Sequence, residues 1–140
     1  MNSPTPIVFS FDDAHRLVSY LIDHGILSES ARANTQVQKA GEGNMNWVAR
    51  VTTPQQELVV KQARPWVEKY PDIAAPITRT NMEYRYLELC SRNATLNKHV
   101  PAILGFAPAE NILILEDLGE IRDGMSCYQL EKYQLSDLVT

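Results

Sequence analysis

The sequence predicts an α+β fold: an antiparallel five-stranded sheet with a helix packed on it, an N-terminal helix before the sheet and the start of a further helix after it. Apolar alternating segments come in two groups, three before and two after one long helical segment. Short turn sequences join the members of each group, which favours antiparallel pairing. With 140 residues, 44% of them hydrophobic and 21% charged, the chain can bury a core of its own.

The predicted helices are marked by apolar residues at helical spacing and by typical start and stop residues. Ser10 precedes the first helix, whose apolar residues share one face, and Gly25 ends it. The second helix covers Ile77–Arg92 and has no internal glycine or proline. Ser126 and Gln129 form the capping box of a last helix that continues to the end of the sequence.

Five strands are predicted from period-two alternation and from valine-rich composition. They are Gln36–Ala40, Met45–Thr52, Glu57–Ala63, Ala102–Phe106 and Asn111–Glu116. The segment that contains Pro65, Pro71 and Pro76 is expected to be a loop. We expect the Ile77–Arg92 helix to cover one face of the sheet.

The charge and composition disfavour several classes of partner. A net charge of −4 and an isoelectric point near 5.3 argue against binding to nucleic acid or to an anionic membrane. No apolar segment is long enough to span a bilayer, and the N-terminus does not have the pattern of a signal peptide, so a cytoplasmic location is expected. Cys90 and Cys127 do not have the spacing of metal ligands, and no metal site is predicted.

The segment KAGEGNMNWVARV, residues 39–51, places two glycines and two asparagines between two predicted strands. Gly41, Gly43, Asn44 and Asn46 are more flexible positions than a tight turn needs. Glycines allow the backbone to approach a phosphate group closely and to turn its N–H groups toward the anion, and asparagine tolerates similar backbone angles. The alternative is a plain flexible hairpin.

Two charged residues are predicted to lie on otherwise apolar faces. Lys61 shares a strand face with Val59, and an unpaired ammonium there would be costly, so it needs an acidic partner or an anionic ligand. Glu83 shares a helix face with three residues, Tyr86, Leu87 and Cys90. We expect Lys61 and Glu83 to pair. The alternatives are an edge strand with Lys61 in water, and an exposed Glu83 paired with Arg79.

The segment ILILEDLGE, residues 112–120, is an apolar strand that loses its alternation in an acidic stretch. Backbone groups at such a strand end can pair with the edge of a ligand. The alternative is an ordinary acidic loop after a strand.

In their order along the chain, these four features resemble the N-terminal lobe of the protein-kinase-like fold. The segments that carry the resemblance are EGNMN, VVKQARPWV, RTNMEYRYL, HVPAILGF and LILEDL. They are similar to the aminoglycoside phosphotransferase and choline kinase superfamily, and within it most similar to the methylthioribose kinases. The similarity covers Gln36 to Gly119. Asn46 stands in place of a third glycine, which suits the small-molecule kinases better than the protein kinases.

The resemblance implies an ATP site and a role for each of its residues. It assigns the phosphates to four loop residues: Gly41, Gly43, Asn44 and Asn46. Lys61 would reach the α- and β-phosphates, and Glu83 would hold Lys61. It assigns the adenine to four further residues: Val48, Val59, Glu116 through its carbonyl and Leu118 through its amide.

The resemblance also implies parts that this sequence lacks, namely a catalytic-loop aspartate and a metal-binding aspartate in a C-terminal lobe. Asp123 and Gly124 are interpreted as a turn. We therefore expect no catalytic residue in this chain, and Mg²⁺ held by the absent lobe. The expected organisation is an N-terminal helical extension over 1–34, the nucleotide-binding lobe over 35–119, and a linker with the start of a C-terminal-lobe helix over 120–140. We expect the chain to be a fragment that is inactive alone.

Three hypotheses about function follow. The first is the ATP-binding lobe of a kinase that transfers the γ-phosphate to a hydroxyl of a sugar-like or amino-alcohol substrate, which would bind in the full-length form. The second is a non-catalytic kinase-like module that binds a nucleotide or a protein partner. The third is an α+β domain with an unrelated role. If the lobe is isolated, apolar surface near the linker and the last helix would favour self-association.

Overall fold

The computed structural model describes residues 7–41, 43 and 45–119. Two α-helices lie in this part of the chain, α1 (Ala14–Asp23) and α2 (Arg79–Ser91). The strands are β1 (Gln36–Lys39), β2 (Trp47–Thr52), β3 (Glu57–Gln62), β4 (Trp66–Val67), β5 (Tyr70–Ala74), β6 (Ile103–Ala107) and β7 (Ile112–Glu116). Short 3-10 helices cover Phe11–Asp13, Glu29–Asn34 and Leu96–His99.

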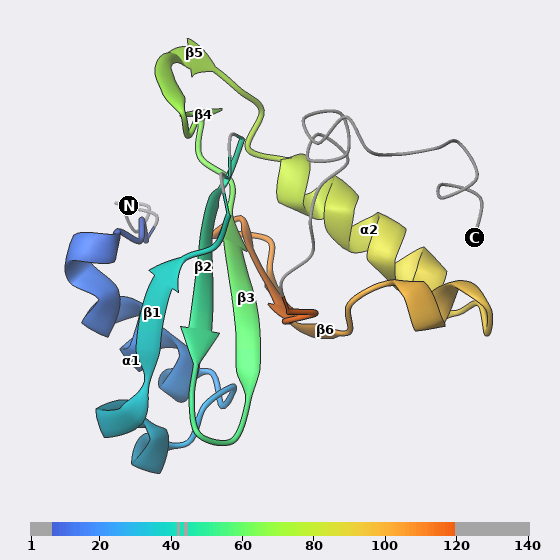
Figure 1. Cartoon of the computed structure of the whole chain (residues 1–140). Helices are drawn as coiled ribbons and strands as arrows, with labels where there is room; N and C mark the ends of the chain where they lie inside the picture. Colours follow the sequence, from blue (N-terminus) through green and yellow to red (C-terminus); the bar gives the residue numbers. More distant parts are fainter. Residues whose placement is uncertain (1–6, 42, 44, 120–140) are drawn as a thin grey trace, which may run out of the picture.

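Five of the strands form one sheet in the order β1-β2-β3-β7-β6, and every neighbouring pair is antiparallel (Figure 1). Hairpins join β1 to β2 and β2 to β3, and the chain then passes through α2 before it returns as β6 and β7. The predicted α+β class, with an antiparallel five-stranded sheet and a packed helix, is confirmed. Each of the five strands lies within two residues of its predicted bounds.

The larger core lies between α1 and the sheet. Leu17 and Leu21 of α1 are fully buried there. The sheet contributes mainly residues of period-two spacing, including Ala49, Val51, Leu58, Val60, Ile112 and Ile114. The amide group of Gln62 fixes the segment before α1, since it accepts from Phe9 N–H at 3.0 Å and donates to the Ile7 carbonyl at 2.7 Å. The first helix is therefore part of the packed fold.

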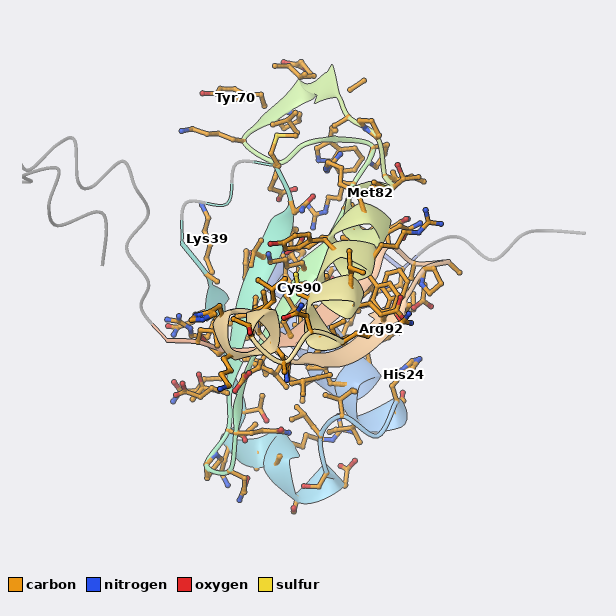
Figure 2. All side chains as sticks on the ribbon, turned by 90° about the vertical axis from the view of Figure 1, so that its right-hand side faces the viewer. His24, Lys39, Tyr70, Met82, Cys90 and Arg92 are labelled. Carbon is orange, nitrogen blue, oxygen red and sulfur yellow. The ribbon has the colours of Figure 1, made fainter. Side chains whose placement is uncertain are left out.

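The opposite face of the sheet is covered by α2 and has a smaller core. Leu87 of the helix packs with Leu113 and Leu115 of β7. Tyr84 stacks on Phe106 of β6 with the ring centroids 4.0 Å apart. Figure 2 is viewed from this side, with α2 in front of the sheet and Cys90 on the helix. The sheet is thus covered on both faces, by different helices.

Three details differ from the sequence predictions. The proline-containing segment forms a small two-stranded sheet, β4 and β5, instead of a loop. Helix α2 begins at Arg79, two residues later than predicted. Tyr86, which was predicted to share the apolar face of the helix, is 62% exposed, whereas Leu87 and Cys90 of that face are buried. The predicted helix after Ser126 lies outside the described residues, and the domain boundaries at 34 and 119 stay predictions.

None of the helices within the described residues combines the length and the apolar character needed to cross a bilayer.

Candidate functional site

Several candidate residues share the sheet face that α2 covers. Val48 of β2 lies directly opposite Lys61 of β3, and Lys61 in turn lies opposite Leu113 of β7. Val59 precedes Lys61 by two residues and is therefore on the same face. Val48, Val59 and Lys61 are all half-buried, whereas their strand neighbours facing α1 are buried. The face thus combines two valines with one ammonium group.

Lys61 forms an ion pair with Glu83 across the gap between sheet and helix. The Lys61 Nζ atom is 2.5 Å from Glu83 Oε1, and the two side chains are 27% and 29% exposed. Glu83 extends from the second turn of α2, so the pair connects the helix to the central strand of the sheet. Neither charge is sealed from solvent, and Lys61 can still contact an anionic ligand.

The glycine-containing loop between β1 and β2 has two positions that favour glycine. Gly41 has φ of 62°, a left-handed conformation that other residues rarely adopt. A Cβ atom on Gly43 would lie 3.1 Å from the Asn46 carbonyl oxygen and 3.5 Å from Val48 Cγ2. The loop backbone therefore folds closely over the start of β2. Asn44, the fourth predicted phosphate ligand, lies outside the described residues.

Arg79 does not pair with Glu83; it binds the glycine-containing loop. Its Nε donates to Asn46 Oδ1 at 3.0 Å, and its Nη2 donates to the Met45 carbonyl at 2.9 Å. The same guanidinium donates to the carbonyl oxygens of Pro76, Arg64 and Trp66. The alternative of an exposed Arg79–Glu83 pair is therefore not the arrangement in the structure.

The segment after β7 is held by groups that the sequence analysis did not identify. Arg50 of β2 forms an ion pair with Asp117, whose side chain is only 2% exposed, and also donates to the Gly119 carbonyl at 3.1 Å. Asp117 Oδ1 accepts from the Gly119 N–H at 2.8 Å. Arg50 lies between apolar residues of a strand, and this position could have indicated a buried acidic partner, by the reasoning applied to Lys61.

The two predicted adenine contacts in this segment differ in their surroundings. The Glu116 N–H donates to the Ala102 carbonyl at 2.9 Å, and the Glu116 carboxylate accepts from the Ala102 N–H at 3.1 Å. Across 7–41, 43 and 45–119, no group accepts a hydrogen bond from the Leu118 N–H. Glu116 is thus bonded to Ala102, the residue before β6, whereas the Leu118 N–H has no acceptor among the described residues.

A hollow of about 270 Å³ lies beside the glycine-containing loop. Three candidate residues line it, Gly43, Asn46 and Val48, together with Phe11, Lys39, Ala40, Trp47, Glu68 and Lys69. Lys61 and Glu83 are not among the lining residues, so the hollow does not contain the ion pair. In the part of the chain that the structure describes, no three His, Cys, Asp or Glu side chains gather in a way that could hold a metal ion.

Comparison with known proteins finds sequence similarity to kinases. The chain is 28% identical over 108 residues to a methylthioribose kinase of Bacillus cereus strain G9842, 27% identical to that of strain B4264, and 24% identical to a methylthioribose kinase of Bacillus thuringiensis strain Al Hakam. Each match covers 74% of this chain but 26% of the relative, so the chain spans about a quarter of the length of these relatives. No protein-family model matches the sequence. The fold and these distant relatives together indicate a kinase-like protein.

Proposed function

We propose that this chain is the nucleotide-binding lobe of an ATP-dependent small-molecule kinase similar to methylthioribose kinase. In the complete enzyme, the γ-phosphate would pass to a hydroxyl of a sugar-like or amino-alcohol substrate. We include a cytoplasmic location in the proposal. The catalytic and metal-binding aspartates would come from a C-terminal lobe, so this chain alone would bind ATP without transferring phosphate.

The observation that carries the proposal is the Lys61–Glu83 ion pair on the face that also bears Val48 and Val59. A lysine held by a helix glutamate is preorganised to meet phosphate oxygens, since its position is fixed before the ligand arrives. The two valines would offer an apolar surface to the adenine. Backbone groups at Glu116 and Leu118 would bind the edge of the base, and Gly41, Gly43, Asn44 and Asn46 would line the phosphates.

The residues of the described lobe would act by binding and orienting ATP. Lys61 would neutralise charge on the α- and β-phosphates, and the glycine-containing loop would exclude water above them. Mg²⁺ would supply further charge neutralisation when bound, through ligands that we assign to the C-terminal lobe. No proton-transfer role is assigned to any residue of this chain.

A titration with ATP tests the proposal. Backbone amide chemical shifts of the 140-residue protein are followed as ATP is added, and separately as adenosine is added. We expect affinity on the order of millimolar or weaker, because half of the binding surface would be missing. ATP should shift the amides of 41–46, 116–118 and the strand that carries Lys61. Saturable shifts elsewhere, with these segments unchanged, would refute the proposal.

Two lysine variants sharpen the test. Lys61→Ala should weaken ATP binding about tenfold, the loss of one charge-assisted contact with phosphate. Lys98→Ala removes an equal charge from an exposed position near α2 and should leave binding unchanged. We also expect no phosphate transfer to methylthioribose, choline or an aminoglycoside by the 140-residue protein. Transfer that Lys61→Ala abolishes would contradict the assignment of catalysis to a second lobe.

A further inference from the structure

The guanidinium group of Arg79 is the most highly connected polar group at the glycine-containing loop. All three of its nitrogens donate, and the acceptors are five oxygens from Met45, Asn46, Arg64, Trp66 and Pro76. These residues come from the loop, from the start of the β4–β5 hairpin and from the segment before α2. Arg79 therefore joins the helix to the loop at a single point.

We propose that Arg79 is a positioning residue that orients Asn46 for the phosphates of the nucleotide. Arginine has hydrogen-bond donors and no acceptor, so the amide oxygen of Asn46 must be the atom that faces Arg79. Both N–H donors of the Asn46 amide are then directed away from the guanidinium. Since Asn46 also lines the hollow beside Gly43, these donors are available to an anion bound under the loop. This inference rests on the proposed function.

The charge of Arg79 strengthens the effect. Its five acceptors are neutral carbonyl and amide oxygens, and no ion pair compensates its charge within the described residues. A cation that donates into the Asn46 carbonyl polarises the amide and makes its N–H groups better donors. The uncompensated charge also favours an anion nearby. A lysine in its place would keep the charge but could not reach several acceptors with a planar group.

The helix also couples the loop to Lys61. Arg79 and Glu83 are one turn apart on α2 and lie on the same side of the helix. Arg79 binds the loop and Glu83 binds Lys61, at 2.5 Å from Nζ. A displacement of α2 would move both contacts together. The structure thus offers one rigid element that places the two groups expected to meet the phosphates.

Arg79→Lys is the variant that tests this role. Arg92→Lys is its matched control at the C-cap of the same helix, where the side chain is 72% exposed and, among the described residues, bonded only to Glu88. The amide shifts of each protein are measured with ATP and with adenosine. We expect Arg79→Lys to reduce the initial slope of the ATP-induced loop shifts about tenfold, the loss of one oriented charge-assisted contact. The adenosine-induced shifts at 116–118 should not change, and Arg92→Lys should behave as the unmodified protein.

The outcomes separate the two proposals. Equal ATP slopes for Arg79→Lys and the unmodified protein would overturn the role of Arg79 and leave the proposed function intact. Parallel losses with ATP and adenosine would show that Arg79 only maintains the fold, which also overturns the positioning role. If ATP shifted neither the loop amides nor those of 116–118 in the unmodified protein, the proposed function itself would be overturned.

A measurement on the unmodified protein decides the question if Arg79→Lys does not fold. The Nε–H resonance of Arg79 reports the hydrogen bond to Asn46 directly. We expect it to shift with ATP and to stay in place with adenosine. Loop amides that respond to ATP while the Arg79 Nε–H resonance remains unchanged would overturn the inference.

Discussion

The Lys61–Glu83 ion pair should contribute measurably to stability, and a double-mutant cycle isolates its contribution. The cycle consists of Lys61→Met, Glu83→Gln and the double variant, each of which keeps the size of the side chain. At the 2.5 Å separation, the Coulomb attraction would be about 1.7 kcal/mol in water and about 7 kcal/mol at an effective dielectric constant of about 20.

Most of this attraction offsets the free energy needed to remove the two charges from water. Both side chains keep more than a quarter of their exposure, at 27% and 29%, so solvent screening reduces the remainder. We therefore expect a coupling free energy of about 1 kcal/mol, which falls as salt is added. The Arg92–Glu88 pair on the same helix is more exposed, at 72% and 41%, and a cycle there should give about 0.3 kcal/mol.

Urea unfolding at neutral pH, followed by far-ultraviolet circular dichroism, measures each variant. The comparison is made at low and at high salt. A coupling between Lys61 and Glu83 no larger than that of the exposed control pair would refute the reasoning, because it would mean that the charges do not meet in solution.

Two further predictions concern the loop and the face that packs on α1. Gly43→Ala should lower the free energy of unfolding by about 1 kcal/mol, because a methyl group would meet a loop carbonyl oxygen at 3.1 Å; an unchanged urea midpoint would contradict this. Burial and the hydrogen bond to Glu110 raise the pKa of the Tyr20 hydroxyl above its usual 10.0, so the folded state keeps a proton that the unfolded state loses. The contribution of Tyr20 to the free energy of unfolding should therefore be fully present below about pH 10 and fall above it by up to about 1.4 kcal/mol per pH unit. Tyr20→Phe should lessen this fall when urea unfolding is repeated between about pH 9 and 11.

The main strands and both α-helices could be predicted because each has a strong local pattern. Period-two alternation in 47–52 and 57–62 corresponds directly to the burial of alternate residues there. The small β4–β5 sheet could not be predicted, since β4 is two residues long, β5 contains a proline and the pairing has an irregular register. Such a short pairing depends on tertiary contacts more than on local sequence.

The candidate site shows the same division between local and distant information. Lys61 and Glu83 could be identified because each places a charge among apolar residues at the correct period. The partners of Arg79 could not, because its two acceptors in the loop are 33 and 34 residues away, and four of its five acceptors are backbone carbonyls. Every residue has a backbone carbonyl, so the sequence does not indicate which carbonyls accept a hydrogen bond. The link between Arg50 and Asp117 spans 67 residues and is equally hidden.

The unequal cores on the two faces of the sheet have a consequence for how the protein fluctuates. The α1 face holds the larger buried cluster, whereas α2 is attached through Leu87, an aromatic stack and polar contacts. Amide hydrogens of β2 and β3 should then exchange with solvent far more slowly than those of α2. The helix that bears Arg79 and Glu83 can open locally while the sheet stays folded. A molecule that binds α2 and displaces it would therefore also move Glu83, the partner of Lys61, while the sheet and its core against α1 stay folded.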